Sequence, residues 1–121
     1  MLDSQFPFPH HRLDVYRVAL EFALGCKNLS GSIPRGHRSL ADQVLRSSSA
    51  IPLLVAEGAN RKSLGTKRQR FEEARGECGE SAAAIELMVV LGFVATEEGE
   101  ACLQLAGRIG AMLTGLIRGM G

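Results

Sequence analysis

Aromatic residues are scarce in this chain of 121 residues, which contains no tryptophan and a single tyrosine. They make up only 5 % of the sequence, whereas alanine and leucine are plentiful. This composition favours helices over strands, because aromatic side chains are enriched in strands and alanine and leucine form helices readily. The length lies within the usual range of about 100 to 150 residues for one domain. We therefore expect a single helical domain.

Net charge is also nearly absent. The 14 lysines and arginines are balanced by 13 acidic residues, which leaves a net charge of +1. This balance gives no overall sign of a nucleic-acid partner, so any such surface must be local. No apolar run approaches the ~20 residues of a membrane span, and the N-terminal residues do not resemble a signal peptide. We expect a cytoplasmic protein without membrane contact.

Cysteines are few, odd in number and far apart in the sequence. Cys26, Cys78 and Cys102 form no CxxC pair and no Cys/His pair at a metal-binding spacing. Each lies within an apolar helical pattern, which favours reduced thiols in a protein core over a redox role. His10 and His11 are adjacent, so in a helix or strand they would not share a face. We expect no metal site.

Catalytic motifs are missing as well. The sequence has no glycine-rich phosphate loop, no HExxH and no Ser/His/Asp set that can be argued from spacing. The serine run at 47–49 has no histidine or carboxylate at helical spacing, so we expect these small side chains to pack between helices. The sequence predicts a protein that is not an enzyme and needs no cofactor.

Four apolar patterns recur at spacings of three and four residues, which is the period of a helix packed on a core. Breaks rich in glycine, proline or charge separate them at 30–36, 60–65 and 92–95, and Asp14, Ser63 and Thr96 are the expected caps. Residues 1–12 are expected to form an extended arm and residues 13–121 the domain. Short links between four helices predict an all-α, antiparallel up-down four-helix bundle. The expected core positions outside the second helix are Val15, Val18, Ala19, Phe22, Cys26, Leu29, Phe71, Ala74, Cys78, Ser81, Ile85, Met88, Gly92, Cys102, Leu105, Ala106, Ile109, Met112, Leu113, Leu116 and Ile117.

The second helix, expected from about 37–39 to 60, has two apolar faces, and a helix of this kind belongs at the centre of a fold or at a subunit contact. The pattern leaves open which face meets the other helices of its own chain. We expect the second face to form an interface between copies of the protein. The first face consists of Leu40, Val44, Ile51, Leu54, Val55 and Gly58. The second face consists of Leu45, Ser49, Pro52, Leu53 and Ala56.

Basic residues gather around the link between the second and third helices. One interpretation is a phosphate-binding patch for RNA or DNA, although no aromatic residue is interleaved for base stacking. The other is a solvated helix end, in which Arg68, Glu72 and Arg75 pair at helical spacing. The candidate nucleic-acid-binding residues are Arg61, Lys62, Lys67, Arg68 and Arg70.

Three blocks of the sequence resemble a known family of four-helix bundles, encoded by intervening sequences in bacterial 23S rRNA genes. The main block runs from Gln43 to Arg61 and contains Arg46, the serines, Ile51-Pro52 and Ala56-Glu57-Gly58. The others are Ala74-Arg75-Gly76 followed by Glu80, and Leu13-Asp14-Val15-Tyr16. Leu54 stands where the family usually has asparagine, and Glu77 where it commonly has serine.

The resemblance implies both assembly and partners. The family includes the accessory protein of diversity-generating retroelements, which forms a pentameric barrel, binds nucleic acid and engages a reverse transcriptase. For this chain it therefore implies a homo-oligomer of five copies that binds RNA or DNA and engages a reverse transcriptase or other partner protein. The alternative is a scaffold oligomer that binds no nucleic acid. Glu57 and Glu80 match the family blocks and are expected to form structural ion pairs with Arg46 or Arg75.

Overall fold

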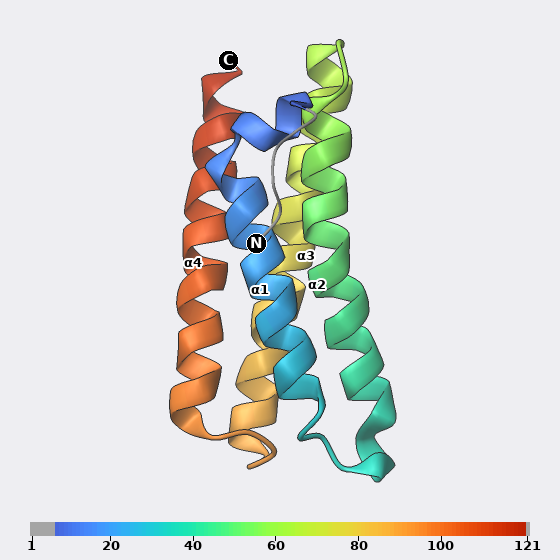
Figure 1. The fold of residues 1–121 in the computed structure, drawn as a ribbon, viewed down its shortest axis with the longest axis vertical. Helices are drawn as coiled ribbons and strands as arrows, with labels where there is room; N and C mark the ends of the chain where they lie inside the picture. The colour runs from blue at the N-terminus through green and yellow to red at the C-terminus, as the bar shows by residue number, and fades with distance from the viewer. Residues whose placement is uncertain (1–6, 121) are drawn as a thin grey trace.

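The computed structural model describes residues 7–120, which form four α-helices and two short 3-10 turns. The helices run antiparallel in up-down order, and each packs against the two beside it, with α4 closing the bundle against α1 (Figure 1). No strand occurs in this part of the chain, so the predicted all-α four-helix fold is confirmed. None of the described helices is apolar over a long enough stretch to cross a membrane. The elements are η1 (Pro9–Arg12), α1 (Asp14–Ser30), η2 (Arg35–His37), α2 (Arg38–Ala59), α3 (Leu64–Val90) and α4 (Thr96–Gly119).

The core is built from the positions that the helical spacing predicts. All six expected residues of α1 are buried, as are those of α3 up to Met88. In α4 the buried stripe is flanked by half-buried Leu105, Met112 and Leu116. Gly92 does not continue the α3 stripe. It has a φ of 77°, and the amide of Phe93 donates to the carbonyl of Met88 at 2.9 Å, so it ends the helix in the left-handed conformation that glycine adopts most easily.

The helix starts differ in part from the expected caps. Ser63 caps α3, since its hydroxyl accepts a hydrogen bond from the amide of Thr66 at 3.4 Å. Asp14 and Thr96 are instead the first residues of α1 and α4, and Leu13 and Ala95 take the cap positions without a side-chain hydrogen bond. The side chain of Asp14 pairs with Arg17 one turn later. In both cases the helix begins directly after an extended apolar residue. The residue expected to cap the helix is therefore already its first helical residue.

The extended arm expected at the N-terminus is only partly within the described residues. Residues 1–6 lie outside them, and Pro9–Arg12 forms the 3-10 turn η1, which packs against α1 and α2 (Figure 1). Pro9 stands at the first position of this turn, where its fixed φ suits a helical start. The segment before α1 is therefore a folded cap on one end of the bundle.

The three cysteines are free and buried. Burial raises the pKa of Cys26 to about 12 and that of Cys78 to about 11. A thiol with such a pKa stays protonated at neutral pH and is a poor nucleophile. The cysteines therefore contribute to the core as small apolar side chains.

Helices α2 and α3 approach each other closely along a seam of small residues. Near one end, Gly58 lies against the ring of Phe71: a Cβ at Gly58 would be 2.8 Å from Phe71 Cε1 and 3.1 Å from Arg70 Cβ. Further along, the hydroxyls of Ser47 and Ser81 are 2.7 Å apart, and Ser81 also donates to the carbonyl of Glu77 at 2.9 Å. Ser47 also lies 3.4 Å from the carbonyl of Val44, so each hydroxyl has a backbone acceptor besides its partner across the seam. These buried serines join the helices.

Replacing Gly58 with alanine should destabilise the bundle. Phe71 is only 2 % exposed, and an added Cβ would be 2.8 Å from its ring, so the methyl group should lower the free energy of unfolding by about 1–3 kcal/mol. The matched control is Gly107→Ala on the exposed side of α4, where no atom lies within 4 Å of an added Cβ. That change should be neutral or stabilising by up to about 1 kcal/mol. Urea unfolding measures the free energy of unfolding of both variants. Equal changes would contradict the tight packing of Gly58 against Phe71.

Candidate functional site

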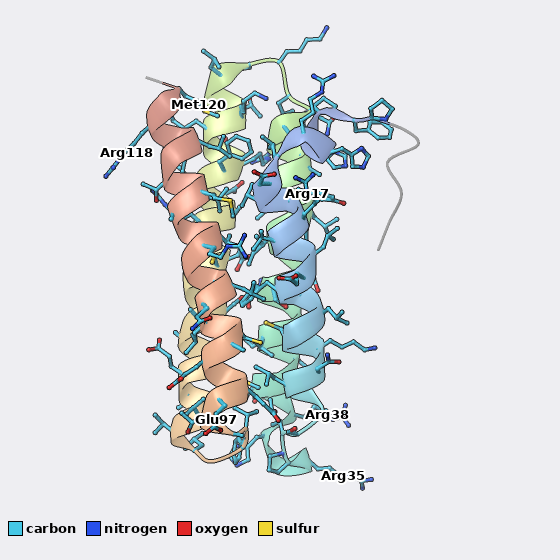
Figure 2. All side chains as sticks on the ribbon, turned by 60° about the vertical axis from the view of Figure 1, so that its left-hand side comes forward. Arg17, Arg35, Arg38, Glu97, Arg118 and Met120 are labelled. Atoms are coloured by element: carbon cyan, nitrogen blue, oxygen red, sulfur yellow. The ribbon has the colours of Figure 1, made fainter. Side chains whose placement is uncertain are left out.

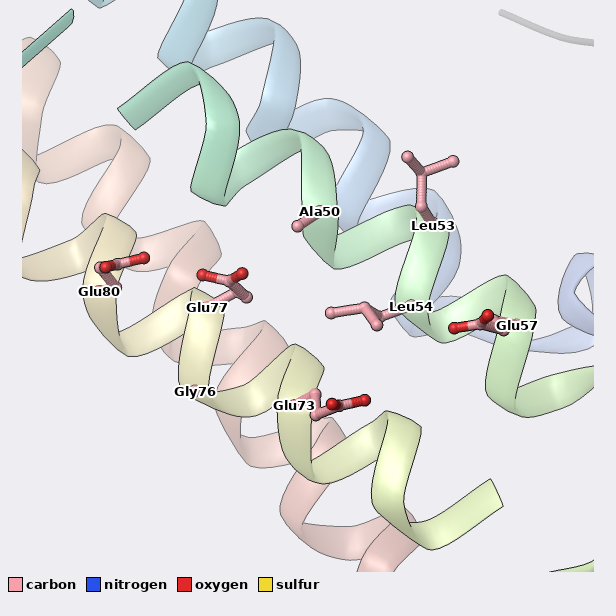
Figure 3. A pocket seen from close by; sticks show the side chains of 8 residues that line it. All are labelled: Ala50, Leu53, Leu54, Glu57, Glu73, Gly76, Glu77 and Glu80. Atoms are coloured by element: carbon pink, nitrogen blue, oxygen red, sulfur yellow. The ribbon is translucent and has the colours of Figure 1, made fainter. Parts of the chain in front are cut away.

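A groove opens between α2 and α3 on the outside of the bundle, with a volume of about 760 Å³. Its apolar side chains come from α2, and most of its carboxylates come from α3 (Figure 3). In the close view, Leu54 points across the gap towards α3, whereas Leu53 points away from it. The lining residues are Ala50, Leu53, Leu54, Glu57, Glu73, Gly76, Glu77 and Glu80.

The apolar part of the groove is exposed to solvent. Leu53 is 70 % exposed, and Leu54 is half-buried against the core. Gly76 provides no side chain on the opposite helix, and nothing lies within 4 Å of where its Cβ would be. The glycine therefore keeps the α3 side of the groove open beside the leucines.

An arginine bridges the two helices at each end of the groove. Arg46 of α2 contacts Glu80 at 2.7 Å and Glu77 at 3.2 Å on α3. Arg70 of α3 contacts Glu57 of α2 through Nε at 2.8 Å and Glu73 through Nη1 at 2.8 Å. The Nε–H of Arg70 is buried and not aligned with an acceptor, so its contact with Glu57 is a charge contact rather than a hydrogen bond. Ion pairs that solvent reaches in this way contribute little to stability individually, because water screens the charges.

The carboxylates of the groove outnumber the arginines that bridge it. Burial raises the pKa of Glu77, and a hydrogen bond with Glu80 raises it further, against the opposing effect of Arg46. The same hydrogen bond, followed by the one from Arg46, lowers the pKa of Glu80. The charged form is therefore favoured at Glu80 and disfavoured at Glu77, although the two side chains share the same arginine.

The predicted ion-pair residues separate into two groups. Arg46 and Glu80 pair directly. Glu57 pairs with Arg70 and, at 3.4 Å, with Arg61, rather than with Arg46 or Arg75. Arg75 makes no ion pair among residues 7–120 and donates a hydrogen bond to Thr114 Oγ1 of α4 at 3.3 Å. Within one chain Arg75 is therefore directed towards α4 rather than towards either acid, and its expected pairing could arise only between bundles.

The second apolar face of α2 is narrower than expected. Leu53 and Ser49 are exposed, and Leu45 and Ala56 are half-buried. Pro52 is buried in its own chain, so it does not belong to an open surface. The reason is that α2 packs against both α1 and α3, which buries a wide arc including consecutive pairs such as Ile51 and Pro52. This arrangement also shows that the face with Val44, Ile51, Val55 and Gly58 is the inner one.

Three of the five candidate nucleic-acid-binding residues are engaged within the chain. Arg61 and Arg70 form the ion pairs described above. Lys67 donates from Nζ to the carbonyls of Gly58 and Ala59, each at 3.1 Å, and so caps the C-terminal end of α2. Lys62 and Arg68 have no ion pair in the described part of the chain. The five residues thus share one end of the bundle but do not form one open patch.

The sequence pattern did not identify Glu73, Glu77 or the capping role of Lys67. The sequence did contain a sign of the acidic stripe, because Glu73, Glu77 and Glu80 follow one another at spacings of four and three residues on α3. One interpretation of the basic residues, a solvated helix end, would pair Glu72 with Arg68 and Arg75. These pairs are absent among residues 7–120, where Arg70 pairs with Glu73. No group of three or more potential metal ligands occurs in that same range.

Comparisons with known proteins agree with this geometry. The family model described as 23S rRNA-intervening sequence protein matches residues 11–115. A solved structure of a protein of unknown function from the S23 ribosomal protein family, from Bacteroides thetaiotaomicron, superimposes with a TM-score of 0.78 at 23 % identity. The match covers 85 % of this chain and 97 % of that one, which shows a shared fold. No curated protein matches the chain significantly.

Glu77 and Glu80 both contact Arg46, but replacing one should change the stability in the opposite direction from replacing the other. Glu77→Gln should raise the free energy of unfolding at neutral pH, because folding disfavours the charged form of Glu77. Glu80→Gln should lower it, because folding favours the charged form of Glu80.

The pH dependence gives the control for this pair of variants. As the pH falls through the pKa of Glu77, the native side chain becomes neutral itself, so the advantage of Glu77→Gln should disappear. The contribution of Glu80 should persist until the pH falls through its lowered pKa. Urea unfolding at neutral and acidic pH measures both changes. Destabilisation by both substitutions at neutral pH would contradict the opposite pKa shifts of the two acids.

Proposed function

Because this chain belongs to the 23S rRNA-intervening sequence protein family, we propose that it is a non-enzymatic assembly protein whose copies associate through α2 and the groove beside it. The observation that carries this proposal is Leu53, which is 70 % exposed above a groove with further apolar residues. Burying a leucine side chain stabilises a contact by about 1.5–3 kcal/mol. The acidic rim would then select a partner surface that brings cations or hydrogen-bond donors.

A second apolar patch supports association into a closed ring. Leu87, Val90 and Leu91 lie near the C-terminal end of α3, and Val90 is 80 % exposed. A ring requires each copy to contact one neighbour on each side through different surfaces. Two separate apolar patches on one protomer meet that requirement. The family resemblance implies five copies in such a ring.

Placing a charge at Leu53 should disrupt the assembly without unfolding the bundle. In Leu53→Glu a charged side chain would have to be buried where the neighbouring copy covers Leu53, so association should weaken strongly. The matched control is Leu64→Glu, because Leu64 is 62 % exposed at the start of α3 and outside the groove. Light scattering should show a lower mass for Leu53→Glu and the native mass for Leu64→Glu. Equal masses for the native protein and Leu53→Glu would refute the interface.

Nucleic-acid binding is a second candidate, favoured by the gathering of cations at one end of the bundle. Arg17 and Arg118 extend near the end where α4 finishes, opposite Arg35 and Arg38 (Figure 2). The link between α2 and α3 lies at that same end and adds Lys62 (Figure 1). Cations placed together attract the phosphate backbone without reading sequence. Assembly would repeat a weak patch and so increase its avidity.

Two double variants, which change the net charge of the protein equally, test nucleic-acid binding at this end of the bundle. Lys62→Glu with Arg68→Glu should reduce the retention of RNA or DNA in gel shifts at low salt. The control, Arg35→Glu with Arg38→Glu at the opposite end, should leave retention unchanged. Added salt should weaken binding by the native protein steeply. No retention by the native protein, or equal losses in both double variants, would exclude this end as a nucleic-acid interface.

A further inference from the structure

The N-terminal segment Phe8–Leu13 lies across one end of the bundle and holds two histidines in an aromatic cluster (Figure 1). The ring of His10 stacks on Phe8 with 5.7 Å between centroids and meets Tyr16 edge-on at 4.6 Å. His10 and His11 are neighbours, with 4.4 Å between ring centroids. The cluster joins the segment to α1 through aromatic contacts.

A hydrogen bond to α2 fixes the protonation state of His10. Asn60 donates from Nδ2 to the carbonyl of Ala56 at 2.7 Å, so this atom is the amide nitrogen and not the oxygen. The same nitrogen lies 2.9 Å from His10 Nδ1. Because the amide nitrogen can only donate, His10 Nδ1 must accept and therefore carries no proton. The contact between the segment and α2 thus requires a neutral His10.

His11 is restricted in the same way. The backbone amide of Phe8 donates to His11 Nδ1 at 3.0 Å. A backbone N–H cannot accept a hydrogen bond, so His11 Nδ1 also carries no proton. The carbonyl of His11 accepts a hydrogen bond from Arg17 at 3.2 Å, which ties the turn to α1. Two adjacent imidazoles therefore hold the segment through Nδ1 atoms that act as acceptors.

We propose that Phe8–Leu13 is a pH-sensitive latch, which two neutral histidines hold closed across the ends of α1 and α2. A proton on either Nδ1 would point an N–H at another donor and break that hydrogen bond. Protonation of both rings would also place two positive charges side by side. On acidification the latch opens and uncovers Tyr16 and the last turn of α2.

The acidic side chains around the latch are paired with arginines. Asp14 pairs with Arg17, and Glu57 with Arg61 and Arg70, so the nearby acids are already engaged. Lys67 caps the carbonyls next to Asn60. The titratable and charged groups on the segment itself and on the elements packed against it are His10, His11, Arg12, Asp14, Tyr16, Arg17, Glu57, Arg61 and Lys67.

The direction of the pH effect follows from His10. Burial, and then the neighbouring His11, lowers the pKa of His10 from its ordinary value of 6.5. A base whose pKa is lower in the closed state stabilises that state fully above the ordinary value. This stability is lost as the pH falls below 6.5 towards the lowered pKa. The latch is therefore closed at neutral pH and opens under mildly acidic conditions.

The chain contains its own reporter for the experiment. Tyr16 is the only tyrosine, and there is no tryptophan, so the intrinsic tyrosine fluorescence reports the packing of the latch against α1. Hydrogen exchange gives a second signal, because the amides of His11 and Leu13 are bonded to the carbonyls of Phe8 and His10. Both are followed from about pH 8 to 5, where histidine titrates. Constant far-UV circular dichroism distinguishes opening of the latch from unfolding.

Two variants and a matched control make the test specific. In His10→Asn with His11→Asn, an amide oxygen can replace each Nδ1 acceptor without titrating, so the transition should disappear. His37→Asn changes the third histidine, which packs on Phe93 at the opposite end, and should keep the transition. Asn60→Ala removes the donor and should open the latch already at neutral pH. A flat native titration, or a transition that persists in the double variant, would overturn the proposal.

Discussion

The close approach of α2 and α3 is the constraint on which the rest of the structure depends. Gly58 admits the ring of Phe71, and Ser47 bonds Ser81 across the seam at 2.7 Å. Small residues at these contacts let the two backbones approach, and larger core side chains of the same helices, such as Ile51 and Ile85, are buried beside them. The groove with Leu53 and the acidic stripe lies between the same two helices, so its width depends on how closely they approach.

The groove combines two properties that an isolated bundle does not need for its stability. Its leucine is exposed, and its carboxylates exceed the arginines that bridge them. Arg46 and Arg70 hold α2 and α3 together at its ends, so the surface between them is presented on rigid helices. Rigid, exposed apolar surfaces of this kind favour association, because little conformational entropy is lost when they are covered.

Helical spacing predicted the fold well and the site only in part. The stripe of Val15, Phe22 and Cys26 depends on local periodicity, which the sequence contains directly. The burial of Pro52 depends on how many helices surround α2, and the partners of Glu57 depend on the register between α2 and α3. The pairing of His10 with Asn60 joins residues fifty positions apart. Such contacts arise only when the chain is folded, so no local pattern could indicate them.

The central claim is that the outer face of α2 is covered by another copy of the protein. Sedimentation equilibrium on the unmodified chain, over a range of micromolar concentrations, tests it most directly. If copies cover this face, the protein should sediment as one defined species whose mass is a whole multiple of that of a single chain. A stable single chain throughout that range would contradict it, because Leu53 and its groove would then remain open to water.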